Sequence, residues 1–471
     1  MTRRSLFLPV VLGVMVAAAL LWLLASGQGA VGADTMPAGT SMPTPTPTPA
    51  PLYVAVTGSD VDNDCASPAA PCRTVQRAID LAWGGTLIRV AQGRYSEVHE
   101  RDGVTQVIYL DESVTLRGGY TTTNGFAEPP QPELHPTILD AQGQGRVIMV
   151  ESAGPTIDGF TISGGGGYYS GGGVWAHAPL RLVLRHNRIV ENSAEGNGGA
   201  VFISGGFAEI RDNVIAWNRG TWAAGLALLN DVDVAVVGNE IRGNEARIRA
   251  GGMDVNCCGR TTPLIAQNLI VENDGGGGGG GIRIMSTNAR LVNNVLALNE
   301  ARSADGILLE DSAGFPVSAT LAHNTLVGRG DGDEGVRAGA YVTATLVNNM
   351  VVSYTTGITN AAPLSATVMA DHTLFAGNDT DYGPGVSSTN DIVGPPSFVS
   401  PGSGDYHITA ASAAESAGVD VGVRVDIDDD PRLGVPDVGA DEYWAPGWPK
   451  RVYLPLISLS QLPDHPPVPL P

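Results

Sequence analysis

Lysine is almost missing from this chain of 471 residues, and charge of either sign is scarce. Lys450 is the single lysine among 27 Lys and Arg, and charged residues make up 16% of the sequence. With 48 Asp and Glu the formal net charge is −21, which excludes a nucleic-acid-binding protein because phosphates require a basic surface. The same charge would repel a polyanionic sugar unless divalent cations bridged it. Four cysteines are too few for a disulfide-dense scaffold.

Glycine, proline and aliphatic residues are plentiful. The 62 Gly and 32 Pro indicate a chain built from turns rather than long helices. A hydrophobic content of 43% excludes a disordered protein and a coiled coil. The length corresponds to two or three average domains or to one long repeat array.

The N-terminus has the pattern of an export signal. Two arginines precede an apolar stretch over residues 6–25, and the small side chain of Ala33 permits cleavage after it. We therefore expect residues 1–33 to be a signal peptide, although the apolar stretch is also long enough to cross a bilayer as an uncleaved anchor. The protein is expected to be extracellular or at the cell surface, with membrane contact only through this segment if it is uncleaved. Residues 34–51 are rich in Thr and Pro and predict an extended linker.

The four cysteines form two sequence pairs. Cys65 and Cys72 flank six residues, which in an exported protein predicts a local disulfide that contributes roughly 2–3 kcal/mol. Cys257 and Cys258 are adjacent, and a vicinal disulfide, two free thiols and half of a metal site all stay open. Neither His nor a further Cys pair stands at zinc spacing nearby, which disfavours the metal.

Between residues 155 and 380 the sequence repeats itself. An asparagine recurs every 25 to 30 residues, with an aliphatic residue two positions after it and another three positions before it. A second asparagine follows five positions later in five consecutive copies. In the unit after Asn349, His372 occupies the position of the first asparagine. The first asparagines of the repeat are Asn187, Asn213, Asn239, Asn268, Asn294, Asn324 and Asn349.

The repeat predicts an all-β solenoid. Each unit runs through a Gly-rich loop into a short strand with a period of two, so about 26 residues per unit give three short strands per coil. Each strand must stack on its own copy one coil later, because no unit buries its apolar face alone. We assign the asparagines a structural role for two reasons. Asn tolerates the left-handed backbone of a tight bend, and stacked amides hydrogen-bond to their copies.

These motifs carry a resemblance to a known fold. The Asn-x-Ile-x-x-Asn spacing followed by Gly-Gly-Val/Ile-x-Ile resembles right-handed parallel β-helix repeats of the pectate-lyase-like superfold. The resemblance covers residues 52–395. Near its start, Val75, Ala78, Ile79 and Ala82 lie on one face of a short predicted helix, which we expect to cap the open end of the solenoid.

The region after the repeats resembles a second family. Asp405-Tyr406-His407 and Asp437-Val438-Gly439-Ala440 are similar to motifs of the choice-of-anchor Q domain, which implies a small β-rich appendage over residues 396–445. Asp429 departs from the Gly usual in that family. A Pro-rich tail, residues 446–471, ends the chain.

For an enzyme, the resemblance to the pectate-lyase-like superfold implies a cleft along one column of strands, which here should be the strand that follows the Gly-rich loop. Its outward positions, coil by coil, are Trp175, Phe202, Ala227, Asp254, Arg283, Leu308 and Arg337. A uronate lyase needs acidic cation ligands beside a base, and the weak candidates are Asp254, Arg283 and Arg337. We expect Asp254 and Arg283 to form a surface pair worth under about 1 kcal/mol. A glycoside hydrolase needs two nearby carboxylates, which no outward position supplies.

The same column offers an aromatic binding platform. Trp175 and Phe202 are expected on adjacent coils, with Tyr168 and Tyr169 in the preceding loop. Exposed aromatic rings suit sugar rings or a protein partner. The alternative is that the long Gly-rich loops fold over these rings and bury them. The glycine run over residues 274–281 is interpreted as a flexible solenoid loop.

No cofactor is required by these motifs, and Ca²⁺ is the one ion that the sequence suggests. Asp426, Asp428 and Asp430 alternate as Ca²⁺ ligands do, although Pro431 stands where an EF-hand loop needs Gly, and a plain acidic turn is the default interpretation. The leading hypothesis is an exported, surface-displayed, non-catalytic β-helix that binds an extracellular glycan or a cell-surface partner. A polysaccharide lyase or glycoside hydrolase and a purely structural spacer are the alternatives.

Overall fold

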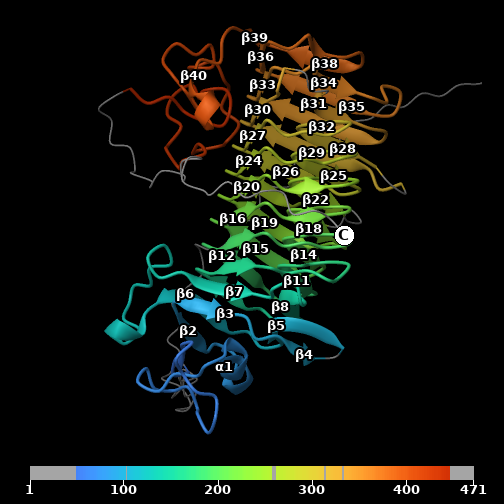
Figure 1. The fold of residues 1–471 in the computed structure, drawn as a ribbon. Coiled ribbons are helices and arrows are strands. Elements are labelled where there is room, and N and C mark those ends of the chain that lie inside the picture. Colours follow the sequence, from blue (N-terminus) through green and yellow to red (C-terminus); the bar gives the residue numbers. More distant parts are fainter. Residues whose placement is uncertain (1–48, 102, 257–260, 312–313, 331–333, 446–471) are drawn as a thin grey trace, which may run out of the picture. The chain divides into compact units, whose positions relative to one another are not determined.

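The computed structural model describes residues 49–101, 103–256, 261–311, 314–330 and 334–445. The predicted signal peptide, most of the linker, the Cys257–Cys258 pair and the Pro-rich tail lie outside these residues. The described chain is a right-handed parallel β-helix of about 11 coils with about 26 residues each, which confirms the predicted fold (Figure 1). Among the described residues, no helix has the length and apolar character needed to span a membrane.

Three sheets run along the solenoid, and almost all of their strands are parallel. Sheet A consists of β1 (Leu52–Val54), β2 (Leu87–Ala91), β6 (Thr115–Tyr120), β9 (Thr156–Asp158), β12 (Leu182–Arg185), β15 (Phe207–Arg211), β19 (Asp233–Val237), β23 (Leu264–Ala266), β26 (Ala289–Val292), β29 (Val317–Ala322), β32 (Val342–Val347), β35 (Thr367–Asp371) and β38 (Val386–Thr389). Sheet B consists of β3 (Gly93–Tyr95), β7 (Thr137–Asp140), β10 (Thr161–Ser163), β13 (Arg188–Val190), β16 (Val214–Ala216), β20 (Glu240–Arg242), β24 (Leu269–Val271), β27 (Val295–Ala297), β30 (Thr325–Val327), β33 (Met350–Val352), β36 (Leu374–Ala376) and β39 (Ile392–Val393).

Sheet C carries the strand that follows each Gly-rich loop. It consists of β4 (His99–Arg101), β5 (Val104–Leu110), β8 (Arg146–Glu151), β11 (Val174–His177), β14 (Val201–Ser204), β18 (Leu226–Leu229), β22 (Met253–Asn256), β25 (Ile282–Met285), β28 (Ile307–Glu310), β31 (Glu334–Ala338), β34 (Thr356–Asn360) and β37 (Thr380–Tyr382). Only β4 pairs antiparallel within this sheet. Two loops add a further short ladder, β17 (Arg219–Gly220) with β21 (Glu245–Ala246).

The core is made of aliphatic columns, one from each sheet. Along sheet A, for example, Leu184 aligns with Ile210 and Ile210 with Val236, and all three are fully buried. Side chains of equal position stack because the register is unshifted from coil to coil. This stacking buries the apolar face that a single unit leaves exposed.

The repeated asparagines form a continuous buried hydrogen-bonded ladder. Asn213 is typical: its Nδ2 donates to Oδ1 of Asn239 at 3.0 Å and to the Leu184 carbonyl at 2.9 Å. Its Oδ1 accepts from both the backbone N and the Nδ2 of Asn187, at 3.0 and 3.1 Å. The same bonds connect the asparagines as far as Asn349, and a second ladder runs from Asn192 to Asn299.

The left-handed residue of each bend precedes the ladder asparagine, which corrects one of the two reasons given for the ladder. His186, Gln267 and His323 have φ values of 52°, 55° and 55°, whereas none of the first asparagines has a positive φ. The role that the structure shows for the asparagines is therefore hydrogen bonding. The equivalence of His372 is also wrong by one residue: Met350 pairs with Leu374, so Thr373 continues the column of Asn349.

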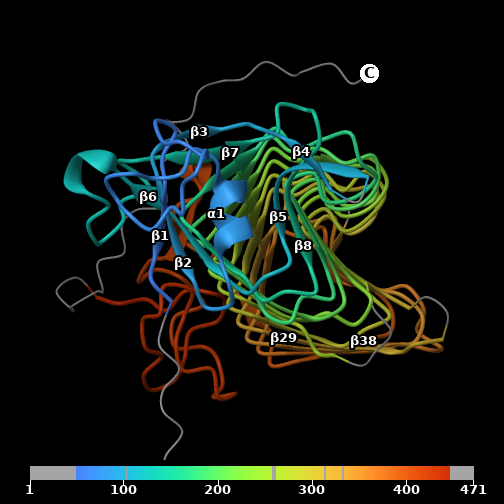
Figure 2. The same ribbon diagram turned by 90° about the horizontal axis from the view of Figure 1, so that it is seen from below.

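The N-terminal end of the solenoid is covered by α1 (Val75–Leu81), which lies across the opening when viewed along the axis (Figure 2). Val75, Ala78 and Ile79 are buried against the core, as predicted. The Gln76 side chain accepts the backbone N–H of Tyr109 at 2.7 Å, which satisfies part of the exposed edge of β5. The Thr74 hydroxyl caps the helix by accepting the N–H of Arg77.

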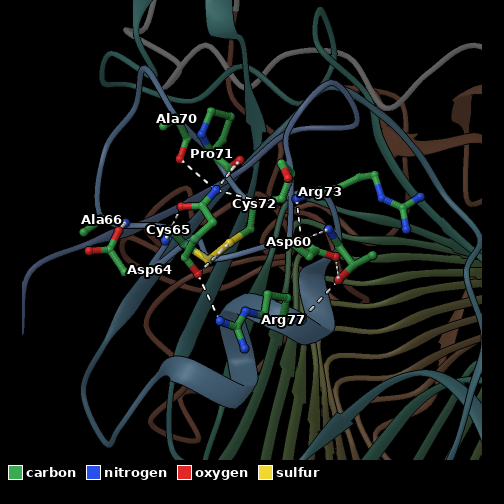
Figure 3. The surroundings of a disulfide bond; sticks show 12 residues. Asp60, Asp64, Cys65, Ala66, Ala70, Pro71, Cys72, Arg73 and Arg77 are labelled. Carbon is green, nitrogen blue, oxygen red and sulfur yellow. Dashed lines mark hydrogen bonds between the residues drawn. A yellow bond between two sulfur atoms is a disulfide. The ribbon is translucent and has the colours of Figure 1, made fainter.

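A disulfide holds the loop that leads into this helix. Cys65 and Cys72 are bonded, with a Cα–Cα distance of 5.0 Å, and both are buried (Figure 3). Arg77 of α1 donates to the Asn63 carbonyl at 3.1 Å, and Asp60 accepts from Arg73 and Thr74. The bridged loop and the capping helix therefore form one unit.

Residues 398–443 form a small module that packs on sheet B and on the adjacent corner of the solenoid. It contains the hairpin β40 (Phe398–Ser400) and β41 (Asp405–Ile408) with the short helix η2 (Pro401–Ser403) between them. Tyr406, Ile408 and Val438 share a buried cluster with Met350 and Leu374 of the solenoid.

The module also contacts the column of left-handed residues, one coil after another. Gln267 donates to the Asp426 carbonyl, Asn293 to the Val425 carbonyl and Asn348 to the Val419 carbonyl. His323 Nδ1 lies 3.0 Å from the Asp437 carbonyl. The corner residues that are not needed for the asparagine ladder thus serve as the docking surface for the module.

Acid should loosen this docking through His323, which is 1% exposed. Its Nδ1–H donates to Asp437 and its Nε2 accepts from Asn348 Nδ2 at 2.9 Å, so only the neutral ring fits. Burial, and then the charge of Arg432, lowers the pKa of His323 from 6.5 to about 3, against weaker opposing effects of the Asp437 and Gly439 backbone and of Asp420. The undocked ring takes a proton below pH 6.5 and the docked ring does not. The contribution of His323 to stability is therefore full above pH 6.5 and falls by about 1.4 kcal/mol per pH unit toward pH 3.

Hydrogen exchange of the Ala440 amide, which donates to Thr325 Oγ1, measures this docking locally. Between pH 7 and pH 5, after correction for intrinsic exchange, the free energy of opening measured at this amide should fall by about 2 kcal/mol because of His323. His323→Gln should remove that pH dependence, whereas His135→Gln, at a half-exposed histidine bonded to Gln92, should keep it. An unchanged pH slope in His323→Gln would contradict the prediction.

Candidate functional site

The outer face of sheet C carries the predicted column in the predicted order. Trp175 pairs with Phe202, Phe202 with Ala227, and Ala227 with Asp254. Asp254 then pairs with Arg283, and the register continues to Leu308 and Arg337. The column divides into an aromatic end and a charged centre.

Aromatic side chains gather at the N-terminal end of this column. The rings of Trp175 and Phe202 have centroids 6.4 Å apart and planes 14° apart, and both residues are half-buried. His177, two positions after Trp175, stacks on the tryptophan ring at 5.9 Å and lies 2.9 Å from Glu151. The rings therefore follow the solenoid axis, coil by coil.

The preceding loops extend this group. Tyr169 is 61% exposed, and its hydroxyl accepts a hydrogen bond from Trp222 Nε1 at 3.2 Å. Tyr168 is half-buried and accepts the backbone N–H of Thr105 at 2.7 Å. We define the aromatic strip as Tyr168, Tyr169, Trp175, His177, Phe202 and Trp222.

Two arginines lie against the rings of the strip. The Arg146 guanidinium lies 4.6 Å from the ring centroid of Tyr168 and 5.0 Å from that of Trp175. Arg249 lies 4.6 Å from the ring of Trp222. These cation–π contacts fix the orientation of the rings and place positive charge beside them. Trp217 is not part of the strip, since it packs against Arg242 of β20 at 4.7 Å.

The charged centre of the column is buried, which corrects the predicted surface pair. Asp254 has no exposed surface and Arg283 is 4% exposed. Arg283 donates to Asp254 Oδ1 at 2.9 Å and to Glu310 Oε1 at 2.6 Å. Burial raises the pKa of the Asp254 carboxyl, against the opposing effect of Arg283.

The Gly-rich loop over residues 274–281 explains part of this burial. A Cβ at Gly278 would lie 2.9 Å from Leu308 Cδ2, and one at Gly279 would lie 2.9 Å from Arg283 Cβ. Gly279 also has a φ of +73°, which favours glycine. The loop packs directly on the column at Arg283 and Leu308, whereas Trp175 and Phe202 keep part of their surface exposed.

The three catalytic candidates, Asp254, Arg283 and Arg337, therefore do not form a solvent-accessible cluster. Asp254 is enclosed, and Arg283 is occupied by two carboxylates. Arg337 is half-buried and donates to Glu334 at 2.5 Å; the loop acids before Glu334 lie outside the described residues. General acid–base chemistry needs a titratable group within reach of a substrate, and Asp254 does not meet that condition.

The three predicted Ca²⁺ ligands do not converge on one point. Asp426 Oδ1 accepts the backbone N–H groups of Asp428 and Asp430, both at 2.9 Å, and its Oδ2 accepts that of Glu442. Burial raises the pKa of Asp426 to about 6. Asp428 instead lies against His407, and its carboxylate raises the pKa of that imidazole to about 10. The sequence did not suggest His407, because it lies about 20 residues from the acids in a different element.

Comparison with known proteins finds one matching family and, among others, three structures that share similarity with this chain. A protein family described as "Protein of unknown function (DUF1565)" matches residues 56–294. Pectate lyase Pel9A is similar in structure, with a TM-score of 0.54 and 14% identity over 84% of this chain and 97% of that one. XylC in complex with xylose has a TM-score of 0.44 and 11% identity over 83% of this chain and 98% of that one. The pectin methylesterase from Aspergillus niger has a TM-score of 0.28 and 14% identity, over 74% and 87%.

At 14% identity the likeness to the pectate lyase establishes the fold and no activity. No curated protein matches the chain. The function must therefore be argued from the side chains of this protein.

Proposed function

Because the chain belongs to the family described as "Protein of unknown function (DUF1565)", we propose its function from the site itself: it binds a polysaccharide along the aromatic strip without cleaving it. The observation that carries this proposal is the pair of parallel, half-exposed rings of Trp175 and Phe202 on adjacent coils. Stacked coils repeat at about 4.8 Å, a spacing of the same order as one sugar ring. A chain of sugars can thus contact successive rings along the axis.

The charge of the protein favours a neutral glycan as the ligand. The sequence carries a formal charge of −21, which repels uronates at long range. The two arginines beside the strip already face aromatic rings. Tyr169 and His177 are exposed and offer hydrogen-bonding groups for sugar hydroxyls at the edges of the platform.

We also propose that the protein is exported and displayed at the cell surface, through the signal over residues 1–33. A bilayer contact would arise only from that segment. This proposal rests on the sequence pattern and on the disulfide between Cys65 and Cys72, which suits an oxidising compartment.

Replacing Trp175 by alanine should weaken glycan binding at least tenfold, because a partly buried ring at the centre of a contact carries a large share of its free energy. The purified chain would be applied to a glycan array with and without Ca²⁺, and the affinity for the best neutral glycan would then be measured by calorimetry. Trp83→Ala is the matched control, since Trp83 is 57% exposed and belongs to the N-terminal cap.

The same samples would be followed for reducing ends and for absorbance of unsaturated uronates. Binding without turnover, lost in Trp175→Ala and kept in Trp83→Ala, is the expected result. Turnover would establish a lyase or hydrolase instead. Equal binding by the two variants, or no binding to any glycan, would remove the support for the strip and favour a structural spacer.

A further inference from the structure

A histidine and three carboxylates meet at a partly exposed position of the C-terminal module. One ligand atom each from His407, Asp428 and Asp441 lie within 4.8 Å of one another. His407 Nε2 is 2.6 Å from Asp428 Oδ2. His407 lies on β41, Asp428 in the turn after Asp426, and Asp441 near the end of the module, so the fold brings together three separate segments.

The second ring nitrogen of His407 is held by a further carboxylate. Nδ1 lies 2.6 Å from Asp405 Oδ1, which also accepts the backbone N–H of His407 at 3.1 Å. A proton on Nδ1 directed at Asp405 leaves Nε2 facing Asp428 and Asp441. Metal-ligating histidines are oriented in this way by an outer carboxylate.

Asp441 is the independent sign of a ligand. It is 8% exposed, and its Oδ2 accepts the backbone N–H of Ile408 at 2.7 Å. No described residue donates a hydrogen bond to its Oδ1. A carboxylate with so little exposed surface and a single hydrogen-bond donor is costly to keep charged, so an electropositive partner is expected beside it.

The excess of negative charge around His407 also favours a cation. Among the described residues, neither Asp428 nor Asp441 forms an ion pair with an arginine, and Arg432 is engaged by Glu442. Even a fully protonated His407 offsets only one of the carboxylates of Asp405, Asp428 and Asp441. A divalent cation would offset the remaining charge.

We propose that His407, Asp428 and Asp441 bind a divalent transition-metal ion, with Zn²⁺ as the best match, and that Asp405 positions His407. One imidazole nitrogen and two carboxylate oxygens are a three-residue donor set that zinc completes with water, whereas Ca²⁺ takes oxygen ligands. The site connects β41 with two distant segments of the module. Tyr406 and Ile408, which flank His407, pack against the solenoid. The metal therefore stabilises the docked module.

Zinc binding to the full chain, first stripped with a chelator, tests the assignment. Calorimetry and elemental analysis should give one Zn²⁺ per chain. His407→Ala and Asp428→Asn should weaken binding at least 100-fold, and Asp405→Asn should weaken it by about 10–100-fold as an outer carboxylate. Asp420→Asn is the matched control, because Asp420 is an exposed acid of the same module that pairs with Arg424. Its affinity should equal that of the unmodified chain.

X-ray absorption of the zinc-loaded, unmodified chain provides a test that depends on no variant. Nitrogen and oxygen neighbours at about 2.0–2.2 Å, including one imidazole, are expected. Sulfur neighbours would assign the zinc to Cys257 and Cys258 and overturn the proposal. Zinc binding that survives His407→Ala, the absence of zinc binding, or a site filled by Ca²⁺ in preference to Zn²⁺ would overturn it as well.

Discussion

Replacing Arg432 by methionine should destabilise the docked module by about 3–5 kcal/mol, because it removes one partner of a buried ion pair. The Arg432 side chain is 1% exposed and donates to Glu442 Oε2 at 2.8 Å. It also donates to the carbonyls of Gly439 and Ala440, and to Asn293 Oδ1 on the solenoid at 3.1 Å. Methionine fills similar space but leaves these acceptors, one of them charged, without donors. Chemical denaturation and exchange of the module amides measure the loss.

Arg424→Met is the control for this experiment. Arg424 belongs to the same module, but its side chain is 71% exposed and pairs with exposed Asp420, so the expected loss is below about 1 kcal/mol. Adding Glu442→Gln to Arg432→Met should recover part of the stability, since no buried charge is then left unpaired. Similar losses of stability in Arg432→Met and Arg424→Met would contradict the prediction that the buried pair of Arg432 and Glu442 holds the module together.

Replacing Asn239 by alanine should cost about 3–5 kcal/mol of folding stability, because it interrupts the asparagine ladder in its middle. Asn239 is 2% exposed. Its Oδ1 accepts the backbone N and the Nδ2 of Asn213, both at 3.0 Å, and its Nδ2 donates to Asn268 Oδ1 and to the Ile210 carbonyl. Alanine leaves the Asn213 N–H and the Ile210 carbonyl without these partners.

Asn239→Asp should not rescue the ladder, because a carboxylate cannot donate and its charge would be buried. Asn197→Ala is the matched control, since Asn197 is a half-buried loop asparagine whose side chain has no hydrogen bond to the described residues. Thermal melts of the three variants give the comparison. If Asn239→Ala and Asn197→Ala have the same melting temperature, the ladder contributes little to stability.

The repeat made the solenoid and the register of sheet C predictable. Each coil repeats the spacing from the asparagine to the next strand, so aligning the copies also aligns Trp175 with Phe202 and Asp254 with Arg283. The buried columns follow from the same alignment, because an unshifted register stacks aliphatic on aliphatic. Local periodicity was sufficient for these features.

Features that depend on how loops fold back could not be predicted in the same way. Asp254 is buried partly because a glycine run lets a loop lie on the column, and composition alone suggested only flexibility for that run. The bend residue before each asparagine also escaped notice, since His186, Gln267 and His323 share a backbone conformation but no side-chain type. His407, Asp428 and Asp441 come together only because the C-terminal module folds three separate segments onto one another. No spacing in the sequence relates them.

The C-terminal module stiffens the part of the solenoid on which it docks. Its hydrogen bonds reach Gln267, Asn293, His323 and Asn348, one on each of four successive coils. With about 4.8 Å between coils, these anchor points span roughly 14 Å of the solenoid axis. Coils within that span cannot twist or part without also breaking contacts to the module. The coils that carry Trp175 and Phe202 lie outside the span, so the module adds no such restraint to them.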